Sequence, residues 1–224
     1  MSAPVAARAA PTVLRHLPIQ RGEDEASWTS SVEVEEVDRA RAREYALLAV
    51  LLLASPDSDL LSRLAAIEGD GTKLGRAHAA LAAAAREADP DALEREHFRL
   101  FVSVGRSDLL PYASYYLTGF LNERPLARLR GDLRRLGIEP ASGLAQPEDH
   151  AGMLCEVMAG FATGAYGAID PAQQAVFFEA HLNPWLGRFF ADLERAADCE
   201  FYRQLGSVGR LFIEIETEAF ALPA

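Results

Sequence analysis

Residues 201–215 read FYRQLGSVGRLFIEI. Their large apolar side chains recur at offsets of three and four residues, at Phe201, Leu205, Val208, Phe212 and Ile215. This spacing forms one apolar stripe along an α-helix, and other elements must cover that stripe. The alternation of apolar and polar residues that marks a half-buried strand is not convincing anywhere in the chain. The segment therefore predicts an all-α fold.

Helical periodicity continues from this segment back to about residue 35. Helices are expected over residues 35–54, 59–67, 72–88, 115–122, 125–136, 147–164 and 171–182, with others starting at Asp89 and Pro184. Thr72, Asp89 and Asp59 are suited to the N-cap positions of three of these helices. We predict a single globular, bundle-like domain of about nine helices over residues 36–224.

Residues 1–35 lack this periodicity. They contain Pro4, Pro11 and Pro18, followed by an acidic run at residues 23–25. Such a composition favours a flexible N-terminal tail. The basic, acid-free start of this tail also weakly resembles an organelle transit peptide.

The chain is acidic, with 33 Asp and Glu against 22 Lys and Arg and a formal net charge of −11. This balance disfavours nucleic acid and anionic membranes as partners, and it either suits a cationic partner or serves solubility alone. The longest apolar run, residues 46–54, is too short for a membrane-spanning helix, which needs about 20 residues. We expect a cytoplasmic protein without stable membrane insertion, in which Cys155 and Cys199 are free thiols.

No motif indicates catalysis or a metal. Glu94 and His97 have the spacing used by di-iron bundles, but such sites need a second pair of this kind and further carboxylates. Residues 69–73, GDGTK, lack the spacing of a phosphate-binding loop, and no GxSxG motif is present. We therefore expect no metal, no cofactor and no catalytic residue.

Asp149 and His150 form a polar pair at the start of an otherwise apolar helix expected to begin at Pro147. Carboxylates near a helix N-terminus are stabilised by the helix dipole, so Glu148 and Asp149 can be capping residues alone. His150, one turn into that helix, is badly placed for a cap. The dipole disfavours its charged form and leaves a neutral ring able to form hydrogen bonds.

Several segments of the chain follow one another in a recognisable order. They are residues 96–101, EHFRLF; residues 111–117, PYASYYL; residues 146–150, QPEDH; and the pair Pro184-Trp185. This ordered set resembles the TorD/DmsD/NarJ family of molybdoenzyme-maturation chaperones, over about residues 40–220. The chain departs from the family pattern at Gln146, Ala113 and Leu154, where family members commonly carry Glu.

The resemblance implies a chaperone rather than an enzyme. Such a protein binds the twin-arginine signal segment and the apo-protein of a molybdopterin-dependent oxidoreductase, assists cofactor insertion and delays export. The residues that the resemblance assigns to client-peptide binding are Tyr112, Ser114, Tyr115, Tyr116, Pro147, Asp149 and His150.

A signal segment carries two arginines and then an apolar stretch, so its receptor needs a hydrophobic groove with carboxylates at one end. Helical spacing cannot bury Tyr112, Tyr115 and Tyr116 together, and at least one of these rings should be exposed or packed on the loop. Two other classes stay open: a helical adaptor for an unrelated protein, and a small helical metalloenzyme. A homodimer is also possible.

Overall fold

The computed structural model describes residues 14–16, 36–102, 109–140 and 146–222. These residues contain ten α-helices and one short two-stranded sheet, so the all-α prediction is confirmed. The predicted flexible tail, residues 1–35, lies outside the described residues except for Leu14–His16. These three residues form a strand, β1, which the sequence did not indicate.

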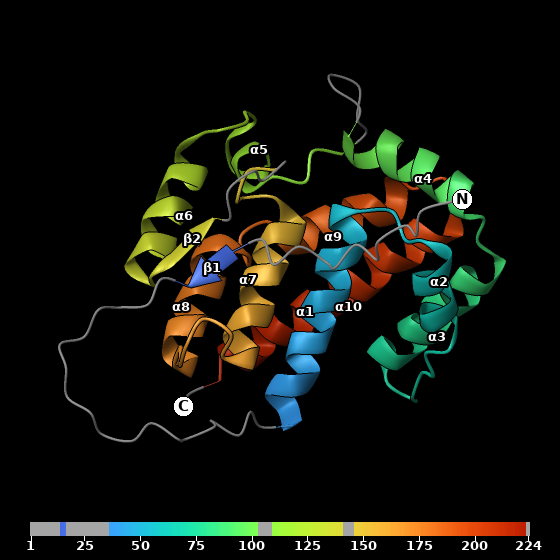
Figure 1. The fold of residues 1–224 in the computed structure, drawn as a ribbon, viewed down its shortest axis with the longest axis horizontal. Coiled ribbons are helices and arrows are strands. Elements are labelled where there is room, and N and C mark those ends of the chain that lie inside the picture. The colour runs from blue at the N-terminus through green and yellow to red at the C-terminus, as the bar shows by residue number, and fades with distance from the viewer. Residues whose placement is uncertain (1–13, 17–35, 103–108, 141–145, 223–224) are drawn as a thin grey trace, which may run out of the picture.

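The centre of the fold consists of four helices packed side by side (Figure 1). They are α1 (Glu36–Leu53), α7 (Ala151–Thr163), α9 (Leu186–Ala196) and α10 (Glu200–Phe220). Helix α1 packs along α7, and α10 lies against both α9 and α3 (Lys73–Glu87). The predicted stripe of α10 is buried at Phe201, Leu205, Val208 and Phe212, whereas Ile215 is exposed.

Other elements surround this centre. They are α2 (Ser58–Ala65), α4 (Pro90–His97) with the π-helical turn η1 (Phe98–Val102), α5 (Ala113–Thr118), α6 (Arg124–Arg135) and α8 (Pro171–His181). The strand β2 (Ile138–Pro140) follows α6 and pairs antiparallel with β1, with Arg15 opposite Glu139.

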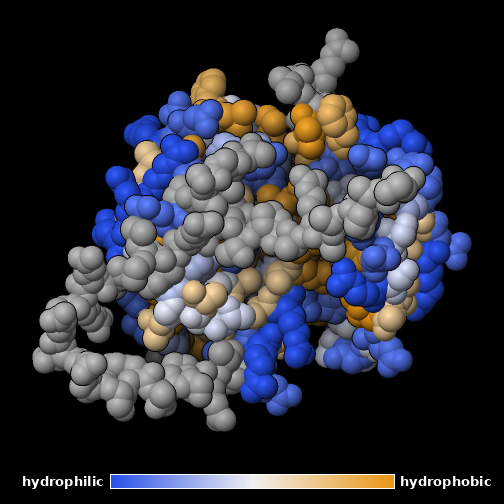
Figure 2. All heavy atoms as spheres, viewed as in Figure 1, coloured by the Kyte–Doolittle hydropathy of each residue, from blue (hydrophilic) through white to orange (hydrophobic). Residues whose placement is uncertain are grey.

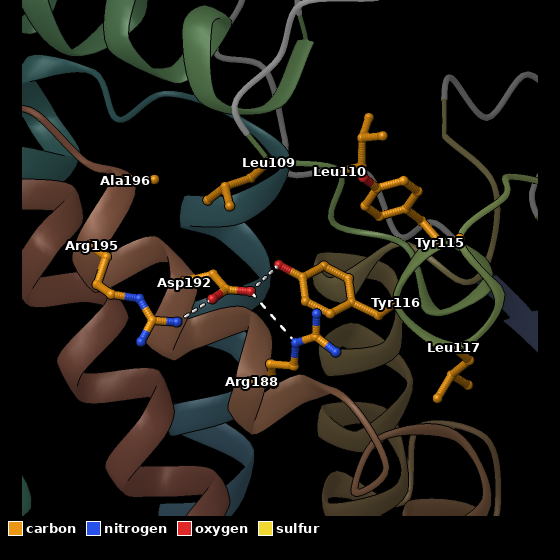
Figure 3. A pocket seen from close by; sticks show the side chains of 10 residues that line it. Leu109, Leu110, Tyr115, Tyr116, Leu117, Arg188, Asp192, Arg195 and Ala196 are labelled. Carbon is orange, nitrogen blue, oxygen red and sulfur yellow. Dashed lines mark hydrogen bonds and ion pairs between the residues drawn. The ribbon is translucent and has the colours of Figure 1, made fainter.

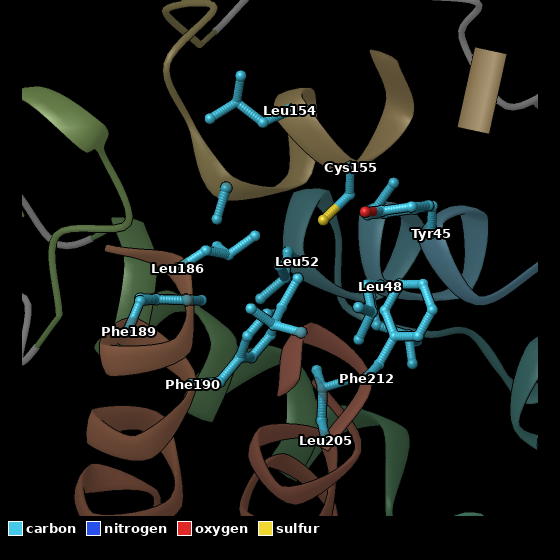
Figure 4. Packing of buried hydrophobic residues seen from close by; sticks show 14 of the residues in the cluster. Tyr45, Leu48, Leu52, Leu154, Cys155, Leu186, Phe189, Phe190, Leu205 and Phe212 are labelled. Atoms are coloured by element: carbon cyan, nitrogen blue, oxygen red, sulfur yellow. The ribbon is translucent and has the colours of Figure 1, made fainter. Parts of the chain in front are cut away.

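The core lies where α1, α7, α9 and α10 meet, and Figure 4 shows its packing. Trp185, Phe189 and Phe190 are almost fully buried there, and Leu48 of α1 packs in the same cluster. Gly152 lets α7 approach α1, because a Cβ atom at this position would come 2.7 Å from Leu53 Cγ.

A charged network lies toward the N-terminal end of α1, away from the contact between Gly152 and Leu53. The Arg41 guanidinium donates to both carboxylate oxygens of Glu216, at 2.9 and 3.2 Å from its Nε. The Tyr45 hydroxyl donates to Glu216 Oε2 at 2.8 Å. Glu216 is only 1% exposed, so these hydrogen bonds replace those that its carboxylate would form with water.

Several helix starts agree with the sequence and others differ. Thr72 and Asp89 cap α3 and α4 as predicted, but the cap of α2 is Asp57 rather than Asp59. The helix expected over residues 115–122 runs from Ala113 to Thr118. The helix expected to start at Pro147 starts at Ala151, and this shift determines the geometry described next.

Candidate functional site

Two segments far apart in the sequence are joined by backbone hydrogen bonds. The Ala113 N–H donates to the Asp149 carbonyl at 2.9 Å, and the Ala151 N–H donates to the Pro111 carbonyl at 2.7 Å. Tyr112 and His150 are thereby paired as an isolated antiparallel bridge. We call this pairing the 112–150 bridge. It fixes the start of α5 against the start of α7.

Asp149 stabilises α5 rather than its own helix. Its Oδ2 accepts the Ser114 backbone N–H, in the first turn of α5, at 2.9 Å. The N-cap of α5, Tyr112, supplies no side-chain cap, so this donor would otherwise be unsatisfied. The sequence placed Asp149 inside a helix begun at Pro147. The residue instead lies before α7 and is 1% exposed.

His150 is the N-cap of α7, which corrects the expectation that it is badly placed for this role. Its Nδ1 accepts the Gly152 backbone N–H at 3.0 Å, so the neutral ring carries its proton on Nε2. Burial, together with nearby His97, lowers the pKa of His150 to about 3. The ring packs edge-on against Tyr112, with centroids 5.2 Å apart.

Gln146 and Glu148 of the 146–150 segment also form hydrogen bonds to neighbouring elements. The Tyr112 hydroxyl donates to Gln146 Oε1 at 2.5 Å, and Pro147 is half-buried. Arg130 of α6 binds the Glu148 carboxylate at 3.0 Å from its Nε and 2.7 Å from Nη2. The segment is therefore a rigid junction between α5, α6 and α7.

A groove of about 600 Å³ opens beside this junction, between α5 and α9 (Figure 3). The residues that line it are Leu109, Leu110, Tyr115, Tyr116, Leu117, Gly119, Arg188, Asp192, Arg195 and Ala196. Tyr115 is 41% exposed, as expected for at least one of the three tyrosines, and Leu117 is 43% exposed. Apolar side chains thus stand at the surface of the groove.

Tyr116 forms the floor of the groove. Its ring packs on Trp185 and Phe189, with centroids 5.3 and 5.9 Å away. Its hydroxyl donates to Asp192 Oδ2 at 3.1 Å, and the Arg188 guanidinium lies 5.5 Å from the ring centroid. Burial and the Asp192 carboxylate raise the pKa of Tyr116, so this hydroxyl stays a donor at neutral pH.

The structure separates the predicted site residues into two groups. The first group, Ser114, Asp149 and His150, is buried. The second group, Tyr115 and Tyr116, lines the groove. Tyr112 is half-buried. Asp149 also lines a second cavity of about 350 Å³, beside α6. Sequence reasoning missed Arg188, Asp192 and Arg195 of α9. These residues occupy the polar face of an amphipathic helix, and nothing in that pattern indicates a meeting with Tyr116.

Metal ligands do not gather within the described ranges. No group of three or more His, Cys, Asp or Glu side chains there could hold an ion. Of the pair singled out by its spacing, Glu94 is exposed, and His97 is buried with its Nε2 at 3.3 Å from the Leu52 carbonyl. No helix among the described residues is long and apolar enough to cross a membrane.

The chain is a helical protein with a groove between α5 and α9, and comparison with known proteins defines its family. Residues 68–191, more than half of the chain, match the nitrate reductase delta subunit family, and the chain belongs to this family. It resembles the chaperone protein TorD of Vibrio cholerae at 31% identity over 120 residues, half of this chain and 53% of that protein. The match thus spans about half the length of this relative.

A second relative is matched along most of its length. The chaperone protein TorD of Shewanella loihica is 24% identical over 84% of this chain and 97% of that protein. The crystal structure of a proposed redox enzyme maturation protein from Archaeoglobus fulgidus has the same fold, with a TM-score of 0.50 and 16% identity. That match covers 88% of this chain and 99% of the other. The family resemblance in the sequence is confirmed, and the matched relatives are named chaperones rather than enzymes.

Proposed function

We propose that the protein is a cytoplasmic chaperone for a molybdopterin-dependent oxidoreductase. It binds the client's signal segment and apo form, assists cofactor insertion and delays export. The observation that supports this proposal is the groove lined by Tyr115, Tyr116 and Leu117, because the family hallmark to which they belong meets the second hallmark, residues 146–150, at the 112–150 bridge. The groove presents exposed apolar and aromatic side chains over a hydrogen-bonded floor, as a receptor for an apolar peptide requires.

The tyrosines and leucines of the groove bind the apolar stretch of the signal segment in this proposal. Tyr115 and Leu117 each keep more than two fifths of their surface free for a partner. Tyrosine suits such contacts because it buries a large area at a small cost in conformational entropy. Tyr116 is held in place by Trp185 and Asp192, so it offers a preformed surface.

Asp149, His150 and Ser114 act as positioning residues in the same proposal. They are buried, and their bonds fix the start of α5, which carries Tyr115 and Tyr116, while Asp149 also lines the 350 Å³ cavity beside α6. Pro147 and Tyr112 complete the junction. The site predicted from the sequence therefore divides into a contact surface and the support beneath it.

Charge determines which part of the signal the groove favours. Asp192 is the one carboxylate among the described lining residues, and Arg188 and Arg195 lie on either side of it. A groove with this balance repels further arginines at short range. It therefore selects the apolar stretch of the signal rather than the arginine pair.

Calorimetric titration with a synthetic twin-arginine signal peptide tests the proposal. Replacing two leucines of the peptide's apolar stretch by serine should weaken binding more than replacing both arginines by glutamine. A peptide with the same composition in scrambled order is the control. Absence of binding to any signal peptide, while another protein binds the groove, would instead identify an adaptor for an unrelated partner.

A further inference from the structure

Another groove, of about 660 Å³, lies between the second half of α3, the start of α4 and the start of α10. We call it the α3–α4 groove. Its apolar lining is mostly alanine: Ala80, Ala83, Ala84, Ala88 and Ala92. Phe201, which is buried, belongs to the same lining. The methyl groups of these alanines offer an apolar wall and leave the space before it open.

Three carboxylates also line the α3–α4 groove, those of Glu87, Asp89 and Glu200. All three residues are exposed, so their charges stand at the edge of the groove. Among the described residues, no Lys or Arg side chain belongs to the lining. The groove thus combines an apolar wall with a negatively charged edge.

Two arginines lie beside this groove, and each is close to one of its carboxylates. Arg203 Nη1 lies 2.5 Å from Glu200 Oε2, and Arg95 Nη2 lies 4.0 Å from Asp89 Oδ2. Glu87 forms no ion pair with any of the described residues. Its carboxylate is therefore available to a cationic partner.

The segments around the groove are negative overall. Residues 86–99 and 198–203 together hold seven Asp and Glu against four arginines. Lys73 and Arg76 precede Glu87 in α3 by eleven residues or more, about 16 Å along the helix axis. Such distant charges are largely screened, because the Debye length is about 8 Å at physiological salt. The charge near the groove therefore favours a cationic partner.

The connection between α9 and α10 joins this groove to the α5–α9 groove. Ala196 lines the α5–α9 groove, and Cys199, three residues later, lines the α3–α4 groove. Three residues span at most about 11 Å. The Asp198 N–H donates to Glu96 Oε1 at 2.8 Å, and Arg99 Nη2 donates to the Ala196 carbonyl at 3.0 Å, so α4 and η1 hold the connection in place. The adjoining ends of the two grooves are close enough for one short segment to reach both.

The two grooves favour different parts of a signal segment. The α5–α9 groove has Arg188 and Arg195 beside its single carboxylate and disfavours further cations. Hydrophobic surface gathers along the upper edge of the molecule, over and beside α5, whereas the right-hand edge, beside α3 and the start of α4, is mainly hydrophilic (Figure 2). A signal segment presents the same two characters in succession, two arginines and then an apolar stretch.

We propose that the α3–α4 groove binds the arginine pair of the client's signal segment while the α5–α9 groove holds the apolar stretch. This inference rests on the function proposed above. The aliphatic stems of the arginines pack on the alanine wall, and their guanidinium groups bind the Glu87 and Glu200 carboxylates. An apolar partner without cations would leave the negative edge of the groove unused, and an anionic partner would be repelled by it.

A double-mutant cycle between protein and peptide tests the proposal. Binding of a twin-arginine signal peptide, and of the same peptide with both arginines replaced by glutamine, is measured by calorimetry at low salt. For the wild-type protein we expect the glutamine peptide to bind about three- to tenfold more weakly, the scale of one or two exposed charge pairs. For Glu87→Gln/Glu200→Gln the two peptides should differ by less than about twofold, because the partners of the arginines are gone.

Two further variants make the cycle specific. Glu87→Gln alone removes a carboxylate without a partner in the fold, and should lower the arginine effect in part. The matched control is Glu214→Gln/Glu218→Gln, at the other end of α10. It also changes two exposed glutamates, of which Glu214 is paired with an arginine, and it should keep the full arginine effect. Circular dichroism melts confirm that all variants fold.

The possible results separate this inference from the proposed function. Absence of peptide binding, or binding that ignores serine substitution in the apolar stretch, would overturn both. Binding that depends on the apolar stretch, with an equal arginine effect in the wild type and in Glu87→Gln/Glu200→Gln, would overturn only the assignment of the α3–α4 groove. The same assignment would be overturned if the double variant dissociated a dimer in sedimentation velocity and left the arginine effect intact, because the groove would then serve a second copy of the chain.

Discussion

The Asp149 carboxylate accepts the backbone N–H of Ser114 at 2.9 Å, across 35 residues of sequence. It thereby caps a helix to which it does not belong. Together with the Tyr112–His150 pairing, this bond ties the start of α5 to the start of α7. The exposed rim of the proposed client groove is carried by α5, so the position of that rim depends on a buried hydrogen bond.

Replacing Asp149 by alanine should lower the free energy of unfolding by about 1–3 kcal/mol, because the Ser114 N–H is left buried without a partner. Asp149→Asn retains an acceptor oxygen and should lose less. Urea unfolding of both variants measures the difference. Asp91→Ala, at an exposed position in the first turn of α4, is the control and should change stability by less than about 0.5 kcal/mol. Equal stability of Asp149→Ala and the wild type would contradict the capping role.

Acid should destabilise the protein through His150. Its pKa is lowered to about 3 in the folded state, so folding favours the neutral ring. The contribution is complete above pH 6.5, the ordinary histidine value, and is lost as pH falls toward 3, at about 1.4 kcal/mol per pH unit. Urea unfolding at pH 7.5, 6, 5 and 4 should show less pH dependence in His150→Asn than in the wild type.

His78 provides a control of opposite sign. Its hydrogen bond to Glu44, at 3.0 Å, raises the pKa of His78 against the effect of burial. Its contribution to stability is therefore present below pH 6.5 and is lost as pH rises through the raised value. His78→Gln should reduce the stability gained on mild acidification, and an identical effect of the two histidine variants would refute the assignment.

Glu216→Ala should destabilise the fold by about 1.5–3 kcal/mol, because the largely buried Arg41 guanidinium loses its bonds to Glu216 and keeps Asp38, at 2.8 Å, as a charged partner. Tyr45→Phe removes only one hydrogen bond to Glu216 and should cost about 1 kcal/mol. The double variant Arg41→Ala/Glu216→Ala completes the cycle. Additive losses in that cycle would show that the pair is not coupled.

Two glycines in helices should respond to alanine with opposite signs. A Cβ at Gly209 of α10 would collide with the Phe190 ring of α9, and we expect Gly209→Ala to cost about 1–3 kcal/mol. A Cβ at Gly131 of α6 would meet nothing within 4 Å, so Gly131→Ala should stabilise by about 0.5–1 kcal/mol. Thermal melts distinguish the two, and destabilisation by both would contradict the packing of α9 on α10.

The sequence was sufficient for the helical class and for helix caps that depend on local bonds. Thr72 and Asp89 bond to amides two or three residues away, so their roles are visible in the local pattern. The start of α7 was predicted four residues early. Proline at a first helical position is a favourable local signal, but the long-range pairing of Tyr112 with His150 keeps residues 147–150 out of the helix.

The candidate site was only partly visible for the same reason. The family hallmarks locate the junction, yet the pattern of residues 146–150 cannot show that Asp149 reaches Ser114 and becomes buried. Asp192 and Arg188 lie on the polar face of α9, where charged residues are expected merely for solvation. Their contact with Tyr116 depends on how α5 packs on α9, which local sequence does not encode.

The most direct test of the proposed chaperone function is titration of the protein with a twin-arginine signal peptide after substitution in the groove. Tyr115→Ala should weaken binding by about 1–3 kcal/mol, the loss typical of an aromatic anchor, and leave stability unchanged because this ring is 41% exposed. Val176→Ala, on α8 outside the groove, should bind like the wild type. Unchanged affinity in Tyr115→Ala, with the peptide still bound, would contradict the assignment of this groove to the client.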